Sequence, residues 1–187
     1  VLCTVGDSFN AGEGGVYLST NALAAIPSFV RTFTAGIGTS ASRTELALHR
    51  SGGGVVTVYA ASGFNGGTVQ RSIDGGATWT QRIDNNFCGG QCFYDIAVEV
   101  DPTNADRVYL GGVGTNTTFT ISNNGGTTFT SSESGLHTDS HVITVAPSLA
   151  TTIYFGSDGG IYKSTDAGIT WASLDNTTFR ATQFMSL

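Results

Sequence analysis

One eight-residue motif occurs three times in the chain and limits the possible folds more than any other feature. The copies are Ser72–Trp79, Ser122–Phe129 and Ser164–Trp171, and they share the pattern Ser-x-Asp/Asn-x-Gly-x-Thr-Trp/Phe. Their starts are separated by 50 and 42 residues. Self-similarity at such a period is typical of arrays of small, similar structural units. The chain is therefore expected to repeat one supersecondary unit.

The residue types in the motif predict a tight turn between two strands. An Asp or Asn side chain can accept hydrogen bonds from the backbone of its own turn, and glycine accepts a positive φ. The Thr and the aromatic residue then begin the next strand, with the ring at the edge of the unit. The structural motif residues are Ser72, Asp74, Gly76, Trp79, Ser122, Asn124, Gly126, Phe129, Ser164, Asp166, Gly168 and Trp171.

A second repeat, out of phase with the first, supplies the other strands of the unit. Residues 101–111 match residues 146–156 around a shared Pro and a shared Tyr-x-Gly, and each match follows an alternating apolar run. Each unit then reads as strand, Pro turn, strand, loop, strand, tight turn, strand. Four antiparallel strands in roughly 45 residues form one blade of a β-propeller.

The predicted fold is therefore all-β, a single propeller domain over 1–187 with about four blades of four-stranded antiparallel sheets. The expected blades cover approximately 1–38, 39–86, 93–133 and 137–176, with a further strand at 179–187. Blade 1 lacks its first strand. Two arrangements stay open: a fragment of a six- to eight-bladed propeller, or a four-bladed ring that the last strand closes. The start at Val1 rather than Met favours an excised or processed piece.

Composition excludes several classes of partner. The formal net charge is −6, only 12% of residues are charged, and the basic residues form no patch, so nucleic acid is not expected as a partner. No apolar run approaches the roughly 18 residues that a membrane helix needs, so no membrane span is expected. No phosphate-binding or dinucleotide-binding motif is present, and no cofactor is expected.

Two cysteines lie close together in the sequence Cys88-Gly-Gly-Gln-Cys92. This spacing can close a small disulfide loop, which would indicate an oxidising compartment. Two free thiols remain the alternative. A metal site is not expected, because no second Cys or His pair follows at the spacing of zinc ligands.

The Ser-x-Asp-x-Gly-x-Thr-Trp turn resembles the Asp-box, or bacterial neuraminidase repeat, of sialidases, sortilin-type receptors and xyloglucan-degrading propeller hydrolases. Residues 93–102 and 137–141 resemble blade openings in large secreted bacterial proteins of this class. The resemblance implies a sialidase-like or sortilin-like β-propeller that a bacterium secretes and that is directed to glycans. It implies little about activity, because Asp-boxes lie at the blade edge, away from the central cleft.

Two carboxylates occupy matching positions in the repeat. Residues 12–20 align with 157–165 without a gap, which places Glu13 and Asp158 in the same loop of the first and fourth blades. Glycosidases use a pair of carboxyl groups about 5–9.5 Å apart. The Asp-Gly-Gly-Ile-Tyr sequence at Asp158 also resembles the catalytic loop of xyloglucan-degrading propellers. The alternative is that Asp158 is a turn residue that binds the adjacent Gly-Gly backbone.

A second candidate site is the sequence His137-x-Asp139-x-His141. If this segment is extended, all three side chains point to one face and can bind a ligand or exchange protons. The alternative is that His141 is a packed inner-strand residue held by Asp139. Tyr94 lies in an inter-strand loop and is a candidate for stacking on a sugar ring.

Three functions stay open from the sequence. The first is a module that binds a polysaccharide or glycoprotein on its central face. The second is a glycoside hydrolase with Asp158 and Glu13 as its pair. The third is a structural repeat that contacts the remainder of its own propeller or another protein. For the first two, the acting residues are expected at the end of the sheets that carries Glu13, Asp158 and the His137–His141 strand, which is expected to begin the fourth blade, opposite the Asp-box turns.

Overall fold

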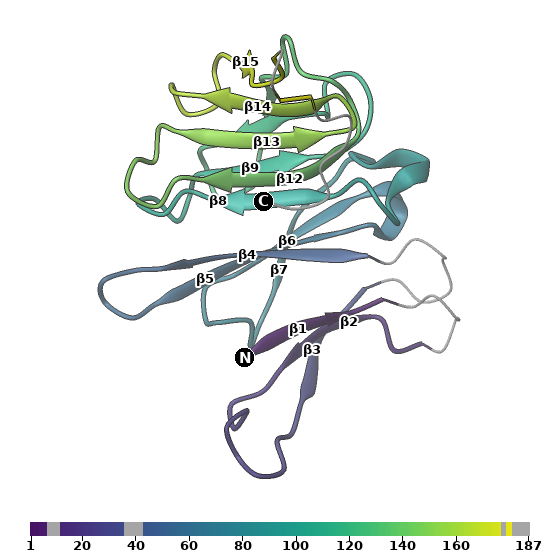
Figure 1. Ribbon diagram of the computed structural model, residues 1–187. Helices are drawn as coiled ribbons and strands as arrows, with labels where there is room; N and C mark the ends of the chain where they lie inside the picture. The colour runs from purple at the N-terminus through teal and green to yellow at the C-terminus, as the bar shows by residue number, and fades with distance from the viewer. Residues whose placement is uncertain (7–11, 36–42, 177–178, 181–187) are drawn as a thin grey trace.

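The protein is all-β, as predicted. The computed structural model describes residues 1–6, 12–35, 43–176 and 179–180. Within these ranges the chain forms strands β1 to β15, two single-turn 3₁₀ helices and no α-helix (Figure 1). None of the helical segments in these ranges has the length and apolarity that crossing a membrane would require.

The strands form four antiparallel sheets, each built from strands consecutive in the chain. The first sheet consists of β1 (Leu2–Val5), β2 (Gly15–Leu18) and β3 (Val30–Thr34). The second consists of β4 (Thr44–Arg50), β5 (Val56–Ser62), β6 (Thr68–Ser72) and β7 (Thr80–Asp84). The third consists of β8 (Ala97–Val100), β9 (Val108–Gly111), β10 (Thr120–Ser122) and β11 (Thr130–Ser131). The fourth consists of β12 (Ser140–Val145), β13 (Ile153–Ser157), β14 (Gly160–Ser164) and β15 (Ala172–Ser173). The helical turns are η1 (Phe64–Gly66) and η2 (Gly89–Gln91).

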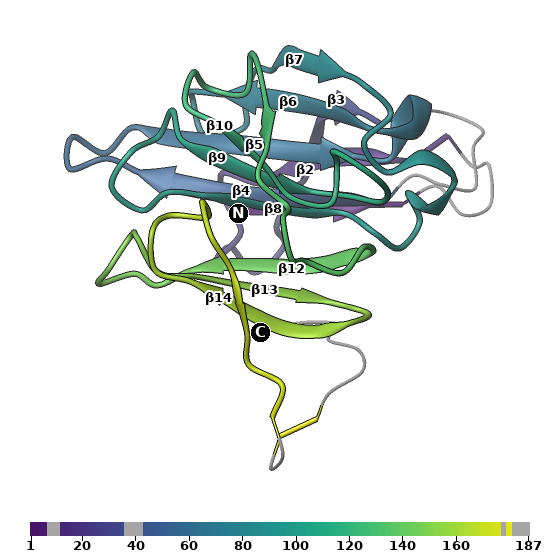
Figure 2. The ribbon, with the colours of Figure 1, turned by 90° about the horizontal axis from the view of Figure 1, so that it is seen from above.

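The third sheet shows how the alternating pattern builds the core. Val98 and Val100 of β8 pack into a cluster with the second sheet, whereas Ala97 and Tyr109 pack into a cluster with the fourth. Successive side chains of a strand point to opposite faces, so both faces of this sheet are covered. Figure 2 shows the fourth sheet as a layer of its own beside the third.

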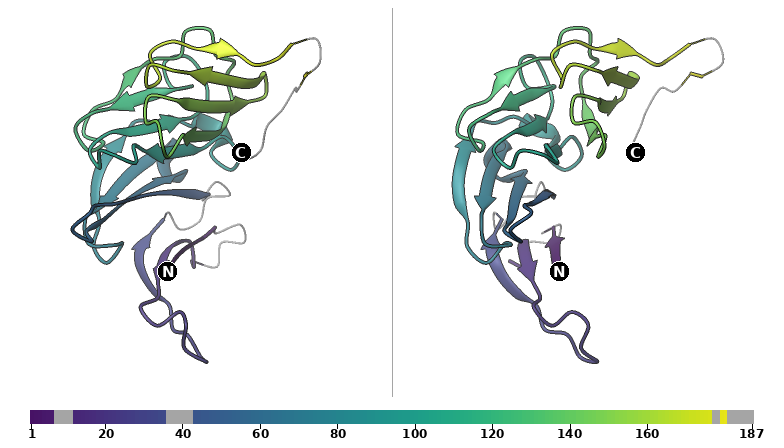
Figure 3. Two further views of the ribbon diagram at one scale, coloured as in Figure 1. Left: turned by 60° about the vertical axis from the view of Figure 1, so that its left-hand side comes forward. Right: turned by 90° about the vertical axis from the view of Figure 1, so that its left-hand side faces the viewer.

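The four sheets follow one another along an arc, which is the geometry of part of a propeller (Figure 3). The first strands β4, β8 and β12 contact one another in turn and lie innermost. The first and fourth sheets stand at opposite ends of the arc, so the described residues form an open array rather than a ring of four. The predicted strand at 179–187 lies almost wholly outside the described residues.

All three repeated turns join the third strand of a sheet to the fourth. In the last copy, Asp166 Oδ1 accepts hydrogen bonds from the backbone N–H groups of Ile169 (3.1 Å) and Thr170 (2.9 Å). Ser164 Oγ donates to the same carboxylate (2.7 Å) and accepts from the N–H of Gly168 (2.8 Å). Asp74 and Asn124 accept the equivalent bonds from their own turns. These side chains therefore replace the backbone bonds that a tight turn leaves unmade.

The aromatic residue that ends each repeat packs against the preceding sheet. Trp171 donates its indole N–H to the carbonyl of Ser132 (2.9 Å), and its ring centroid lies 4.7 Å from that of Phe119. Trp79 donates to Thr32 Oγ1 in the first sheet (3.1 Å), and Phe129 packs on the cluster between the second and third sheets. The repeated turns thus join neighbouring sheets as well as neighbouring strands.

Candidate functional site

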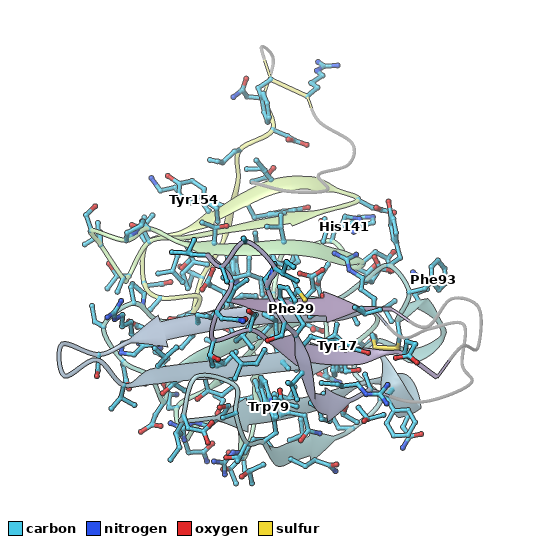
Figure 4. All side chains as sticks on the ribbon, turned by 90° about the horizontal axis from the view of Figure 1, so that it is seen from below. Tyr17, Phe29, Trp79, Phe93, His141 and Tyr154 are labelled. Atoms are coloured by element: carbon cyan, nitrogen blue, oxygen red, sulfur yellow. A yellow bond between two sulfur atoms is a disulfide. The ribbon has the colours of Figure 1, made fainter. Side chains whose placement is uncertain are left out.

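Strand order places the connections between strands at two opposite ends of the sheets. In an antiparallel meander, the turns between second and third strands and the links to the next sheet emerge at one end. The repeated Asp/Gly turns emerge at the other. Figure 4 shows His141 and Phe93 toward the same end as Tyr17, with Tyr154 toward the opposite end. We call the end that holds His141 the site end.

A chain of three ionisable side chains crosses the boundary between the third and fourth sheets at the site end. His141 of β12 lies 2.6 Å through Nε2 from Asp158 Oδ1, in the β13–β14 turn. Its Nδ1 lies 3.3 Å from Oδ1 of Asp95, just before β8. The side chains of Asp95 and His141 are 0% and 1% exposed, whereas that of Asp158 is 42% exposed. A buried pair therefore lies behind one carboxylate that solvent can reach.

The disulfide-bonded loop before β8 contributes the next polar group. Cys88 and Cys92 are joined by a disulfide, and η2 lies between them. Gln91 of this turn donates from Nε2 to Asp95 Oδ2 and to Asp139 Oδ1, the latter at 3.1 Å. One amide thus connects carboxylates that belong to two different sheets.

Two aromatic rings border this network. Tyr94 stands edge-on to His141 with ring centroids 4.8 Å apart, and its backbone carbonyl accepts a hydrogen bond from Arg43 (2.5 Å). Phe93, whose ring centroid lies 6.3 Å from that of Tyr94, is 59% exposed. An exposed ring beside polar groups is typical of sites that bind partly apolar, partly hydroxylated ligands.

Burial dominates the electrostatics of Asp95. Removal from water disfavours its charged form and raises the pKa of its carboxyl group. The hydrogen bond from Gln91 and the charge of His141 oppose this rise, and the nearby Asp139 and Asp158 add to it. By contrast, local hydrogen bonds, the side chain of Thr170 first, lower the pKa of exposed Asp166 from 3.8 to about 2.

The expectation that His137, Asp139 and His141 lie on one extended strand is wrong. β12 begins at Ser140, and Asp139 has a φ of 66°, in the left-handed region that Asp tolerates in turns. The bend directs Asp139 to Gln91, so Asp158 and Asp95, rather than Asp139, hold His141. His137 precedes the bend and lies beside Gly159, where a Cβ would be 2.3 Å from the His137 Cβ.

Asp158 and Glu13 have different partners. The carboxylate of Asp158 bonds His141, while the N–H of Gly159 bonds Ser157 Oγ (3.2 Å). Glu13, in the first sheet, accepts a hydrogen bond from Tyr17 (3.1 Å) and lies 3.9 Å from Arg31. Strand order puts both residues at the site end, Glu13 just before β2 and Asp158 between β13 and β14. The second and third sheets lie between their two sheets along the arc (Figure 3).

Sequence reasoning did not select Asp95 or Gln91 as site residues. Asp95 lies two residues before β8, the inner strand of the third sheet. A charged residue directly before the buried inner strand was the available signal. The partner of Asp95 lies in another sheet, so its role appears only in the folded protein. The described residues hold no cluster of His, Cys, Asp and Glu arranged to bind a metal ion.

Comparison with known proteins supports the fold assignment. No protein-family model matches the chain. A xyloglucanase from Hypocrea jecorina (strain QM6a) is 29% identical over 150 residues, which cover 74% of this chain and 18% of that protein. The chain thus spans about a fifth of the length of this curated relative.

Two solved structures resemble the chain over most of its length. The GH74 enzyme of Niastella koreensis has a TM-score of 0.66 and 23% identity, over 87% of this chain and 27% of that one. An ancestral GH74 enzyme has a TM-score of 0.59 and 19% identity, over 95% of this chain and 24% of that one. The sheets of this chain are therefore arranged as in part of a β-propeller.

Proposed function

We propose that this protein is a secreted, glycan-directed propeller that binds a polysaccharide at the site end. The observation that carries the proposal is the carboxylate of Asp158, which is open to solvent and held from behind by buried His141. Phe93 is exposed and comes two residues before buried Asp95 in the sequence, next to the same network. A fixed hydrogen-bond acceptor beside an aromatic ring can bind the hydroxyl groups and the apolar face of a sugar.

The charges of the site favour a neutral polysaccharide over an acidic one. Asp95, Asp139 and Asp158 gather here, and the guanidinium of Arg43 bonds Glu45 (2.7 Å) and a backbone carbonyl. Like charges would repel uronic or sialic acids. The relative described as a xyloglucanase supports a polysaccharide of this class. We include glycoprotein glycans as ligands only where those glycans are neutral.

The disulfide at Cys88 and Cys92 supports secretion, because disulfides persist in oxidising compartments outside the cytosol. The protein should therefore be found in the culture medium of the bacterium that makes it. Labelling of free thiols in the secreted protein should modify Cys3 and leave Cys88 and Cys92 unmodified unless a reductant is added. Labelling of all three without reductant would contradict this placement.

Binding can be tested by affinity electrophoresis in gels that contain xyloglucan. Phe93→Ala should lower the affinity about tenfold, since an aromatic contact of this kind contributes roughly 1–1.5 kcal/mol. The matched control is Ile169→Ala, which removes an equally exposed apolar side chain (64%) at the opposite end of the fourth sheet. Equal retardation of both variants would contradict a glycan site at Phe93.

A glycoside hydrolase is the second candidate, favoured by the solvent-open carboxylate of Asp158. Asp95 is fully buried and cannot touch a substrate, so the partner carboxyl would come from elsewhere at the site end, and Glu13 is the candidate there. In this mechanism Asp158→Asn abolishes the release of reducing ends from xyloglucan, and Glu13→Gln lowers it comparably. Wild-type protein that binds xyloglucan without releasing reducing ends would leave binding as the function. Activity that survives Asp158→Asn in a folded variant would exclude Asp158 from the reaction.

A further inference from the structure

Two buried atoms face each other without another hydrogen-bond partner. Oδ1 of Asp95 and Nδ1 of His141 are 3.3 Å apart, and neither atom makes any other hydrogen bond in the described part of the chain. Both side chains are almost fully shielded from water. Buried polar atoms are costly when unpaired, so this contact requires a hydrogen between the two atoms.

The second ring nitrogen of the same imidazole also contacts a carboxylate. Nε2 of His141 lies 2.6 Å from Asp158 Oδ1, slightly shorter than is usual even for a charge-assisted N–H···O hydrogen bond. A neutral imidazole has one N–H and one lone pair, so it can donate to only one of two flanking carboxylates. If both contacts are hydrogen bonds, the trio must hold one proton more than a neutral imidazole does.

The groups packed around the trio are mostly acidic or neutral. Gln91 donates to Asp95 Oδ2 and connects it to Asp139. Tyr94 presents its ring edge-on to the imidazole, and Arg43 binds the carbonyl of Tyr94. His137 lies beside Gly159, next to Asp158. The charged groups at this boundary are therefore Asp95, Asp139 and Asp158, with Arg43 and Glu45 paired behind Tyr94.

We propose that Asp95 is a positioning residue: a proton shared between Asp95 Oδ1 and His141 Nδ1 keeps the other ring hydrogen on Nε2, where it holds the carboxylate of Asp158. Three side chains from two sheets thus share two protons. The consequence for ligands rests on the proposed function, because Asp158 is the member of the trio that a glycan can reach.

The arrangement predicts a pH-dependent release of Asp158. When the shared proton passes to solvent at higher pH, one ring hydrogen remains for two carboxylates. Asp95 is buried and its Oδ1 has no other donor, whereas water can solvate Asp158, so the hydrogen moves to Nδ1. Nε2 then presents a lone pair to Asp158, and the 2.6 Å contact is lost. Burial, which raises the pKa of Asp95, favours retention of the shared proton.

Asp95→Asn separates this role from a purely structural one. The amide has the shape of a protonated carboxyl: its oxygen can accept from Gln91 while its N–H₂ donates to Nδ1 of His141. The variant should therefore hold the ring hydrogen on Nε2 at every pH. Asp139→Asn is the matched control, because Asp139 bonds Gln91 and not the imidazole.

Nitrogen-15 NMR of the ring nitrogens reads out the outcome without any glycan. The chain has three histidines, and His141→Gln identifies the signals of His141. Between about pH 5 and about pH 9 the wild type and Asp139→Asn should change from Nε2–H to Nδ1–H, and Asp95→Asn should keep Nε2–H. One unchanging tautomer in the wild type, or the same pH course in Asp95→Asn, would overturn the inference.

Xyloglucan affinity measured over the same pH range then tests the link to function. Affinity should fall severalfold as the wild type loses the shared proton and stay constant in Asp95→Asn. If the NMR results are as expected but neither protein binds xyloglucan, the positioning role stands and the proposed function fails. If both proteins bind with the same pH course while the tautomers differ, the link between Asp95 and binding is overturned.

Discussion

Asp166 and Asp158 are both carboxylates in turns of the fourth sheet, yet their surroundings differ in every respect. Asp166 satisfies its oxygens with Ser164, Ile169 and Thr170, all within four residues along the chain. Asp158 bonds a histidine 17 residues away, which itself faces another sheet. The first carboxylate completes a local turn, and the second is held in place by tertiary structure with its other face open.

This difference suggests a division between the two ends of the sheets. The repeated turns join strands and sheets, so substitutions there should act on stability. The site end holds a polar network whose outer member is exposed, so substitutions there should act on binding. Substitutions at the two ends of the sheets test whether the division holds.

Trp171→Ala should be the most destabilising change, lowering the free energy of unfolding by about 3 kcal/mol. The indole packs on Phe119 and Phe155 and donates to the carbonyl of Ser132, so its loss opens the boundary between two sheets. Urea unfolding measures the effect. Ile169→Ala, in the same turn but largely exposed, should change it by less than about 0.5 kcal/mol.

Cys92→Ser should cost about 2 kcal/mol, as expected for opening a five-residue loop. Cys92 lies at the site end, so this change should affect both stability and xyloglucan binding. Loss of the loop frees Gln91, which connects Asp95 with Asp139. Xyloglucan affinity and urea unfolding should therefore weaken together, whereas Trp171→Ala should leave affinity unchanged in the folded fraction.

Asp166→Asn should change stability in a way that depends on pH. The pKa of Asp166 is lowered to about 2 from 3.8, so its stabilising effect is present above about pH 4 and disappears as the pH falls toward 2. The wild type should therefore lose more thermal stability between about pH 5 and about pH 2 than the variant does. Asn124 makes the equivalent turn bonds with an amide, so the variant should still form the turn.

Asp158→Asn should have the smallest effect on stability, about 0.5 kcal/mol or less, because the side chain is partly exposed and the Asn amide oxygen can still accept from Nε2 of His141. Xyloglucan binding should nevertheless be lost. A melting temperature that falls by as much as in Trp171→Ala would show that Asp158 is a structural turn residue and that the two ends do not differ as proposed.

The sequence predicted the repeated turns well because their hydrogen bonds are local. A spacing of two to four residues between Ser164, Asp166 and Thr170 already defines the contacts, and three copies reinforce the pattern. The network of Asp95, His141 and Asp158 could not be predicted in this way, because it depends on the packing of two sheets. The sequence placed Asp158 and His141 at one end of the sheets but offered no sign of the contact between them.

The bend at Asp139 shows a second limit. Alternating residues at 137, 139 and 141 favoured a strand, and a single left-handed residue changes the direction of the chain instead. Asp tolerates this conformation but does not require it, so the pattern alone cannot distinguish the two outcomes.

The aromatic residue of each repeat packs against the sheet that precedes it in the chain, which favours an order of assembly. Trp79, Phe129 and Trp171 all reach back to a sheet that comes earlier in the chain. During synthesis, the sheet against which each new sheet packs has already been translated. The aromatic ring of the new sheet can therefore pack against it before any later residues are present. Assembly can therefore proceed one sheet at a time from the N-terminal side, with each step burying the apolar face that the previous step left exposed.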